Sequence, residues 1–495
     1  MINIISVGGY DLDEEQVKAA TSDAKNILVI AGAGSGKTTT IIGKIKYLIN
    51  NGVLPNEILC ISFTNASVNS LKNKIKEEIN NDIDVYTFHK LSLNILSSYR
   101  LEYKLCMPNL LEYLVDEYFN YIILNDIDAM YTVIKYYNIY NLRYNVRKKY
   151  QEINKDKLKQ IIIKFIRLMK TNGYDIKEFR KFYKWKFKTR TYYFLKIVLI
   201  IYQLYMLELT SSNEIDFDDM IIKATDVVNK TGIKNNYKYI IIDEYQDSSL
   251  VRFNLVKSII NKTNAFLFVV GDDFQSIYKF AGCNLNIMLD FNKYFEDSKI
   301  LKISNTYRNS QELIDIAGKF VMKNKKQIKK NLKSNKHLKT PIQIIEYKNY
   351  KNDFKKIIEK LLDKKILVLG RNNKDIYDLI DDDYIIDKNG NITYLPLDIN
   401  MRYMTIHKSK GLEEEVVILI NLKDDIMGIP SKIEDDKVLN LVSPKIDKYP
   451  YSEERRLFYV ALTRTKSYVY LYVPKYHKSM FVKEIIKIVN NSKLS

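Results

Sequence analysis

Short apolar runs alternate with longer stretches of mixed polarity along most of this chain. The apolar runs predict buried strands, and the stretches between them predict helices with one apolar face. The clearest strand candidates are Ile27–Ile30, Ile58–Phe63, Tyr239–Ile242, Ala265–Val270, Ile366–Leu369 and Val416–Ile420. Because strands and helices in alternation are typical of parallel sheets, we predict an α/β fold.

Two stretches depart from this alternation. Residues 92–210 are rich in Tyr and Lys, have a mostly helical period and contain few turn signals, so we predict a helical insertion within the first α/β unit. A Lys-rich stretch, Lys319–Lys339, follows a predicted helix at Gln311–Val321. It could contact nucleic acid, but a solvated surface is the simpler interpretation.

Composition narrows the class of protein. With 495 residues, the chain is long enough for two to four domains. No apolar run is long enough to span a membrane, and the N-terminus lacks a secretory signal pattern. Cys60, Cys106 and Cys283 are too far apart in sequence to suggest a metal or disulfide motif. We therefore expect a cytoplasmic protein with no membrane partner.

The charge balance favours a polyanionic partner such as nucleic acid. Lys and Arg total 78 against 59 Asp and Glu, which gives a formal net charge of +19. Residues with AT-rich codons (Lys, Asn, Ile and Tyr) are abundant, and this abundance accounts for part of the excess. The net charge by itself is therefore only modest support for a nucleic-acid partner.

A phosphate-loop pattern follows the first predicted strand. Ala31, four residues and then Gly36-Lys37-Thr38 match the loop whose backbone N–H groups surround nucleotide phosphates. Lys37 would reach the phosphates, Thr38 would ligate Mg²⁺, and the following helix would direct its N-terminus at the anion. The predicted nucleotide-binding residues here are Ala31, Gly32, Ala33, Gly34, Ser35, Gly36, Lys37, Thr38 and Thr39.

Acidic and amide side chains follow two later strands. Asp243 and Glu244 come directly after Tyr239–Ile242, where ligands bind in open parallel sheets. Asp243 is our candidate Mg²⁺ ligand and Glu244 our candidate general base. Gln275 follows the strand ending at Val270 and is suited to orienting water or sensing the γ-phosphate. The aromatic residues Tyr278 and Phe280 next to it offer flat faces on which bases could stack.

Further motifs occur in order from Leu12 to Lys466, nearly the whole chain. They are LDEEQ (12–16), ISFTN (61–65), TFH (87–89), IDFDD (215–219), NTYR (305–308), TIHKSKGLE (405–413) and ERRLFYVALTR (454–464). With the phosphate loop and the acids, they resemble the motifs of superfamily 1 DNA helicases of the UvrD/Rep/PcrA type. The resemblance implies two RecA-like P-loop NTPase domains with parallel sheets. We expect the first at 1–91 and 211–298, the helical insertion at 92–210, and the second at 299–495.

The resemblance assigns an ATP site to both domains. It implies that Gln16 reads adenine, that Tyr307 packs on the base, and that Glu413 approaches the ribose. Arg308 and Arg464 would reach the γ-phosphate from the second domain, where two cations neutralise charge in phosphoryl transfer. The expected cofactors are ATP and Mg²⁺. The expected catalytic set is Lys37, Asp243, Glu244, Gln275, Arg308 and Arg464.

The resemblance also implies a path for single-stranded DNA and duplex junctions. The residues expected to face DNA are Phe63, Thr64, Asn65, His89, Tyr278, Phe280, Thr405, His407 and Lys410. Outside the motifs, residues 179–194 interleave cations with aromatic rings around Trp185, the single tryptophan. This pattern suits a single-strand channel, or else a helix with buried rings and solvated lysines.

Three departures from the family pattern limit the comparison. Ala281 stands where the family usually has Arg, and Phe280 where Trp is usual. The interval from Arg371 to Thr405 is too short for the regulatory subdomain of larger relatives, and this compact form is closer to the helicase IV branch. Third, no nuclease domain or zinc ribbon is expected after the last motif.

The sequence therefore predicts an ATP-dependent DNA helicase that translocates on single-stranded DNA in repair, replication or recombination. Its 3′-to-5′ polarity is implied by the resemblance alone. Two alternatives stay open. One is a translocase that displaces proteins or remodels RNA polymerase without net unwinding. The other is a subunit of a nuclease complex, either its motor or an inert DNA-binding component.

Overall fold

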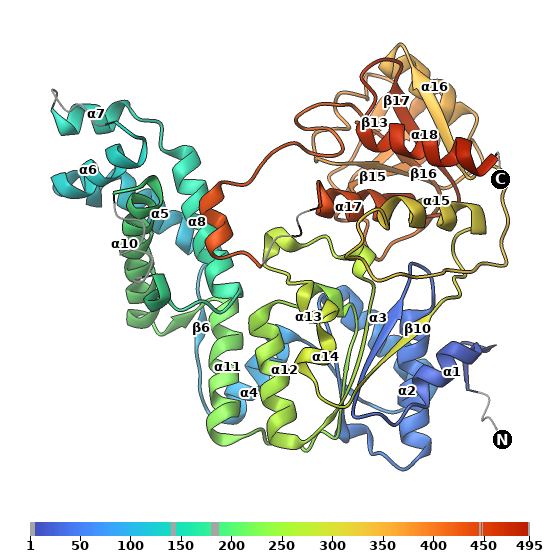
Figure 1. Cartoon of the computed structure of the whole chain (residues 1–495), viewed down its shortest axis with the longest axis horizontal. Coiled ribbons are helices and arrows are strands. Elements are labelled where there is room, and N and C mark those ends of the chain that lie inside the picture. The colour runs from blue at the N-terminus through green and yellow to red at the C-terminus, as the bar shows by residue number, and fades with distance from the viewer. Residues whose placement is uncertain (1–4, 140–144, 180–187, 445–446, 448, 494–495) are drawn as a thin grey trace.

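Two large β-sheets dominate the computed structural model, which describes residues 5–139, 145–179, 188–444, 447 and 449–493 (Figure 1). The first sheet has six parallel strands in the order β10-β3-β9-β8-β4-β5. They are β3 (Asn26–Ala31), β4 (Ile58–Ser62), β5 (Asp84–Thr87), β8 (Tyr239–Ile242), β9 (Phe266–Gly271) and β10 (Ser298–Ile303).

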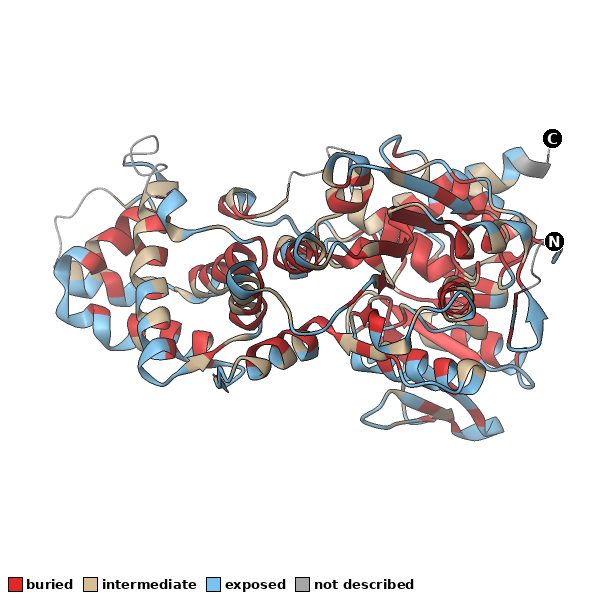
Figure 2. Cartoon of the chain, turned by 90° about the horizontal axis from the view of Figure 1, so that it is seen from below, coloured by how far each residue is buried: buried red, intermediate tan, exposed pale blue. Residues whose placement is uncertain are grey.

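Helices cover both faces of the first sheet, so its central strands are buried on both sides. In β3, Ile27 and Val29 face one core while Leu28 and Ile30 face the other. Figure 2 shows buried residues concentrated where the helices meet the sheets. The helices of this part are α1 (Glu14–Ala20), α2 (Lys37–Asn50), α3 (Asn65–Ile79), α4 (Phe88–Ser98), α11 (Phe217–Thr231), α12 (Leu250–Thr263), α13 (Asn286–Leu289) and α14 (Phe291–Tyr294).

The second sheet is parallel except at one edge. Its order is β11-β17-β16-β12-β15-β14-β13, and only the β13–β14–β15 edge is antiparallel. The strands are β11 (Ile342–Tyr347), β12 (Ile366–Gly370), β13 (Tyr384–Ile386), β14 (Asn391–Tyr394), β15 (Ile399–Thr405), β16 (Glu414–Leu419) and β17 (Thr465–Pro474). The β13–β14 hairpin occupies the short interval between Arg371 and Thr405. Its helices are α15 (Gln311–Val321), α16 (Tyr350–Glu359), α17 (Ser452–Leu462) and α18 (Met480–Lys493).

A helical region projects from the first sheet, at the left of Figure 1. It contains α5 (Leu110–Asn120), α6 (Ile127–Tyr136), α7 (Val146–Glu152), α8 (Asp156–Thr171) and α10 (Arg190–Ser211). The chain enters and leaves it through the short parallel pair β6 (Lys104–Leu105) and β7 (Glu214–Ile215). Contrary to the expectation from the sequence that no segment is long enough to span a membrane, α10 could cross one by length and composition. However, Phe194, Ile201 and other α10 residues pack in the core of this region, as expected for a core helix.

A segment of the second half of the chain also packs against this helical region. The 3-10 helix η7 (Lys437–Leu441) lies beside α8, and Val438, Leu439 and Val442 join the helical core. Two surface ion pairs flank this contact. Arg190 Nη2 is 2.8 Å from Asp436 Oδ2, and Lys164 Nζ is 2.5 Å from Asp435 Oδ1. The helical region is therefore tied to both sheet units.

The predicted α/β class with two largely parallel sheets is confirmed, and it is consistent with two RecA-like domains. The predicted boundaries need adjustment in two places. β10 pairs with β3, so the first sheet extends past the boundary expected at 298. Similarly, α4 runs past residue 92 and buries Ile95 and Leu96 under the first sheet. The basic and aromatic pattern at 179–194 lies mostly outside the described residues, Trp185 included.

Candidate nucleotide and DNA sites

The phosphate loop joins β3 to α2 through backbone conformations that favour glycine. Gly34 and Gly36 have φ angles of 71° and 78°, in the left-handed region. Gly36 is the N-cap of α2 and supplies no side chain to cap it. The first N–H groups of α2 are therefore without side-chain partners, which is what an anion-binding helix N-terminus requires. The loop fits a nucleotide phosphate.

Gln16 is held against this loop by the start of α1. Asp13 caps α1, accepting from the Gln16 backbone N–H at 2.8 Å, while Gln16 Oε1 accepts from the Asp13 N–H at 3.1 Å. The remaining amide nitrogen of Gln16 donates to the Ser35 carbonyl oxygen at 3.1 Å. The predicted adenine-reading residue is thus attached directly to the phosphate loop.

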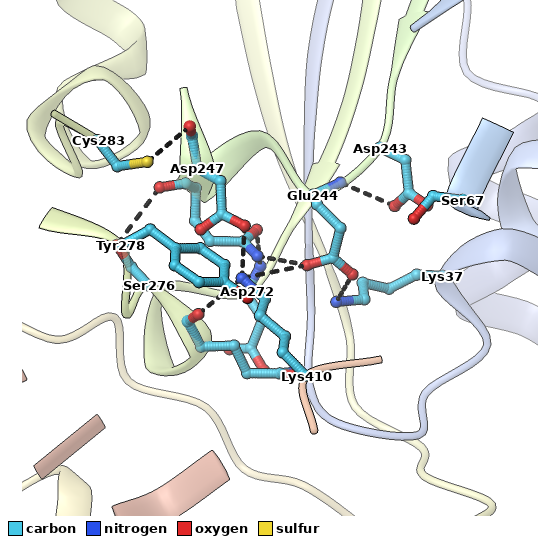
Figure 3. Close-up of polar contacts among 12 residues, drawn as sticks. Lys37, Ser67, Asp243, Glu244, Asp247, Asp272, Ser276, Tyr278, Cys283 and Lys410 are labelled. Atoms are coloured by element: carbon cyan, nitrogen blue, oxygen red, sulfur yellow. Dashed lines mark hydrogen bonds and ion pairs between the residues drawn. The ribbon is translucent and has the colours of Figure 1, made fainter. Parts of the chain in front are cut away.

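Asp243 and Glu244 follow β8 and lie beside Lys37 (Figure 3). Glu244 Oε1 is 2.6 Å from Lys37 Nζ, and Glu244 Oε2 accepts from Gln246 Nε2 at 2.5 Å. Glu244 has a φ of 51°, which is uncommon for a residue other than glycine and marks a strained turn at the site. The Lys37 ammonium group, which pairs with Glu244 in this structure, can pair with a nucleotide phosphate through the same positive charge.

The two carboxyl groups have opposite pKa shifts. Burial and the neighbouring Glu244 raise the pKa of Asp243 to about 6. Burial also opposes ionisation of Glu244, but the ammonium groups of Lys37 and Lys410 outweigh it and lower its pKa to about 2. Glu244 is therefore anionic at neutral pH, and this half-buried carboxylate would stabilise a cation bound beside Asp243.

Thr38 and Asp243 are the residues that could hold Mg²⁺. Among the described residues, no group of three or more His, Cys, Asp or Glu side chains is arranged to hold a metal ion. In nucleotide sites Mg²⁺ is commonly bound through one or two protein ligands together with phosphates and water. The donor set present therefore fits Mg²⁺ only together with a nucleotide.

A chain of hydrogen bonds leads from the acids to the second sheet unit. Gln246 Oε1 accepts from the Asp272 backbone N–H at 2.9 Å, and Asp272 Oδ2 accepts from Gln275 Nε2 at 2.6 Å. Gln275 Oε1 then accepts from Arg464 Nη2 at 3.1 Å. Since Gln246 also donates to Glu244, an almost fully buried polar network connects the phosphate loop with α17.

The segment Asn305–Arg308 lies directly on the phosphate loop. Thr306 Oγ1 donates to the Ala33 carbonyl at 2.7 Å, and the Tyr307 N–H donates to the Gly34 carbonyl at 2.9 Å. A Cβ atom on Gly34 would come within 2.5 Å of the Arg308 Cβ, so this contact depends on the glycine. The Tyr307 hydroxyl donates to Asp13 Oδ2 at 2.7 Å, which places its ring beside the start of α1.

The two predicted arginine sensors come together from opposite ends of the second half of the chain. Arg308 Nε is 2.6 Å from Glu413 Oε2, and Arg308 Nη1 donates to the Thr463 carbonyl at 3.3 Å. Arg464 follows α17 and is 1% exposed. The structure therefore assembles the predicted ATP residues around one loop, while their individual roles stay predictions.

One ring from each of two aromatic clusters lines a cavity of about 450 Å³ between the first sheet unit and the helical region. In one, the exposed Phe280 ring lies 5.5 Å from the His407 ring, and the Tyr278 hydroxyl donates to the His407 carbonyl at 3.0 Å. In the other, the His89 ring lies 4.9 Å from the exposed Phe217 ring. Phe217 and Phe280 both line the cavity.

Both histidines of these clusters are neutral at pH 7. Burial and the nearby Arg252 lower the pKa of His89 to about 4, and burial and Arg371 lower that of His407 to about 4. They can therefore stack or form hydrogen bonds but carry no charge for a phosphate. Phe217 is not among the residues expected from the sequence to face DNA, although it lies within the IDFDD motif at 215–219.

Other residues expected to face DNA have mixed surroundings. Thr64 caps α3, accepting from the Ser67 N–H at 3.1 Å, and Asn65 is exposed beside it. Phe63 packs on Phe88 at 5.3 Å between ring centroids. Thr405 is buried at the end of β15.

Lys410 points inward to the acids, not to solvent. Its Nζ lies 2.5 Å from Asp247 Oδ2 and donates to the Gln275 carbonyl at 2.9 Å, and its side chain is 7% exposed (Figure 3). This geometry fits a link between the two sheet units better than a direct phosphate contact.

A phosphate loop on one parallel sheet, faced by two arginines from a second, defines a two-sheet P-loop nucleotide hydrolase. Comparisons narrow this class. Residues 12–296 match the UvrD/REP helicase N-terminal domain, and residues 388–476 match the UvrD-like helicase C-terminal domain. The chain belongs to the UvrD/Rep helicase family of ATP-dependent DNA helicases.

Sequence similarity to known DNA helicases extends over nearly the whole chain. DNA helicase IV of Escherichia coli is 26% identical, over 96% of this chain and 70% of that protein. The ATP-dependent DNA helicase Rep of Buchnera aphidicola subsp. Schizaphis graminum is 28% identical, over 94% of this chain and 71% of that protein. A probable DNA helicase of Mycoplasma pneumoniae is 26% identical, over 93% of this chain and 83% of that protein.

Proposed function

We propose that this protein hydrolyses ATP to move along single-stranded DNA in the 3′-to-5′ direction and to separate duplexes. The observation that carries the proposal is the polar network from Lys37 and Glu244 through Gln275 to Arg464. It connects the nucleotide loop with the second sheet unit within a few residues of the aromatic cluster at Tyr278 and Phe280. A cytoplasmic location, where ATP and DNA meet, is part of the proposal.

The nucleotide site has a role for each of its groups. The uncapped start of α2 and Lys37 bind the phosphates, and Gln16 and Tyr307 bind the base. Mg²⁺ held by Thr38 and Asp243 would neutralise phosphate charge when bound. Lys37 leaves Glu244 for the phosphates, which frees Glu244 to accept a proton from the attacking water.

The second sheet unit responds to the γ-phosphate through Arg308 and Arg464. In the present structure the Arg464 guanidinium lies on Gln275 of the first unit. Arg308 has its Cβ position beside Gly34 of the phosphate loop, while its guanidinium pairs with Glu413 of the second unit. A γ-phosphate gives these cations a stronger anionic partner and draws the units together, and hydrolysis removes it. The resulting change in the spacing of the two units is the movement that advances DNA.

The DNA strand lies along the exposed rings at the cavity between the first unit and the helical region. Bases stack on Phe280 and Phe217, with the neutral rings of His407 and His89 beside them. Ala281 provides no cation after Phe280, and Lys279 directly before Phe280 is the adjacent cation at this point.

The test is ATPase activity with and without single-stranded DNA, together with strand separation on 3′-tailed, 5′-tailed and blunt duplexes. We expect hydrolysis to be stimulated by DNA and unwinding to require a 3′ tail. The Lys37→Ala and Glu244→Gln variants should lose both activities. ATPase that does not respond to DNA would refute the motor. Stimulated ATPase without unwinding would favour a translocase that displaces proteins.

A further inference from the structure

Lys330 is buried, although it belongs to the Lys-rich stretch that the sequence predicts to be solvated. Its side chain is 3% exposed, and the carboxylates of Asp272 and Asp273 beside it are fully buried. Lys330 Nζ contacts Asp272 Oδ1 and lies 2.5 Å from Asp273 Oδ1. The ammonium group also lies 3.6 Å from the centre of the Phe274 ring. The interpretation of Lys319–Lys339 as a solvated surface is therefore wrong at this residue.

Such an arrangement needs a reason beyond stability. Removing three charges from water costs several kcal/mol per ion, and a buried ion pair often contributes no more than an apolar contact of the same volume. The two adjacent aspartates also repel each other unless a cation lies between them. Lys330 comes from the segment after α15, whereas both aspartates follow β9 of the first sheet. The ion pair thus joins two separate parts of the fold.

The partners of Lys330 lead directly to the nucleotide site. Asp272 contacts Lys330 through one carboxylate oxygen and accepts from Gln275 Nε2 at 2.6 Å through the other. The opposite end of the Gln275 amide accepts from Arg464 Nη2 at 3.1 Å. Without the cation, Asp272 would lose its ion-pair partner, and the Phe274 backbone N–H, which donates to Asp272 Oδ1 at 3.1 Å, would be left to hold that oxygen.

Asp273 fixes Lys330 from the other side. Its second oxygen, Oδ2, accepts from Gln327 Nε2 and from the Ile328 backbone N–H, each at 2.8 Å. Gln327 Oε1 in turn accepts from Arg456 Nη1 of α17 at 3.3 Å. The segment that carries Lys330 is therefore anchored at both ends of the aspartate pair, and a displacement of this segment relative to the first sheet would be transmitted to Asp272.

We propose that Lys330 is a positioning residue of the ATPase: by holding Asp272, it directs the Gln275 side-chain amide toward Arg464. The inference rests on the proposed function, because ATPase activity is what the experiment measures. It adds a functional residue that lies outside the motifs named above. Lys330 touches no reacting atom. Lys330 instead sets the fraction of ATP-bound protein in which Gln275 is correctly oriented. It therefore affects kcat and leaves the affinity for ATP unchanged.

The experiment compares Lys330→Met, Lys330→Arg and the matched control Lys329→Met, whose wild-type side chain is exposed next in sequence. For each variant the melting temperature, the Kd of a fluorescent ATP analogue, and kcat and KM with saturating single-stranded DNA are measured. We expect Lys330→Met to lower kcat by about 10- to 100-fold with KM and Kd within about twofold. Lys330→Arg should recover most of kcat, and Lys329→Met should match the wild type.

A second variant separates positioning from folding. Lys330→Met with Asp273→Asn removes one repelling carboxylate and should regain most of any lost stability, while kcat stays low because Asp272 is still without its cation. Recovery of kcat together with stability would overturn the proposal, as would a raised KM with unchanged kcat in Lys330→Met. Wild-type protein whose ATPase ignores DNA would instead refute the motor, and the effect of Lys330 on basal kcat would still be measured.

Discussion

Replacing Arg464 by Ala tests whether the buried guanidinium acts on the γ-phosphate or only holds the fold. Arg464 Nη2 donates to Gln275 Oε1 at 3.1 Å, Nη1 to the Leu412 carbonyl at 3.2 Å, and Nε to the Val460 carbonyl at 3.0 Å. Burial and the neighbouring Arg308 lower the pKa of Arg464 to about 9. It is therefore charged at pH 7 to 8, and truncation removes both its hydrogen bonds and its charge.

The two effects have different sizes. Each buried acceptor left without its donor costs roughly 1 kcal/mol, so Arg464→Ala should lower the free energy of unfolding by about 2–4 kcal/mol. Loss of an arginine that stabilises phosphoryl transfer lowers kcat by about 10³-fold or more, equivalent to roughly 4 kcal/mol of the activation barrier. Lys at this position retains the charge but cannot reach Leu412 and Gln275 together, so Arg464→Lys should lie between Ala and the wild type.

The assay is DNA-stimulated ATPase at a temperature where urea unfolding shows all variants to be more than nine-tenths folded. The Kd of a fluorescent ATP analogue is measured in parallel. We expect kcat to fall by about 10³-fold in Arg464→Ala, with Kd changed by less than about fivefold. If folded Arg464→Ala retains more than a fifth of wild-type kcat, then Arg464 serves the fold alone and the two-sensor reasoning fails.

Three further predictions concern the acids and the DNA grip. Glu244→Gln should slow hydrolysis by about 10²- to 10⁴-fold yet tighten ATP-analogue binding, because Lys37 loses its carboxylate partner; weaker binding in a fluorescence titration would contradict this. Because burial and Glu244 raise the pKa of Asp243 to about 6, protons should compete with Mg²⁺ at lower pH. The KM for Mg²⁺ should therefore rise about tenfold per unit below pH 6, and a flat profile from pH 7 to 5 would argue against Asp243 as a ligand. Phe280→Ala should weaken single-stranded DNA binding by roughly 1–3 kcal/mol in fluorescence anisotropy, whereas Phe280→Trp should not; equal affinities in all three proteins would remove Phe280 from the DNA path.

The local parts of the fold were readable from the sequence. The six strands expected from apolar runs, β3, β4, β8, β9, β12 and β16, lie within one or two residues of the predicted bounds, since a parallel strand covered on both faces must be apolar along its length. The glycines of the phosphate loop were equally local, because φ angles such as 71° at Gly34 exclude most side chains whatever the rest of the chain does. Asp243 and Glu244 could be placed because both follow a strand end in a parallel sheet.

Only the tertiary structure decided which charged residues are buried and what they hold. Lys330 and its exposed neighbour Lys329 have the same side chain in the same Lys-rich stretch, and no local pattern separates them. Asp272, the buried counter-ion of Lys330, lies 58 residues away in sequence. Lys410 likewise points inward because Asp247, 163 residues away, compensates its charge. Burial of an ion is stable only beside a counter-ion, and the pairing of distant counter-ions is a property of the assembled sheets.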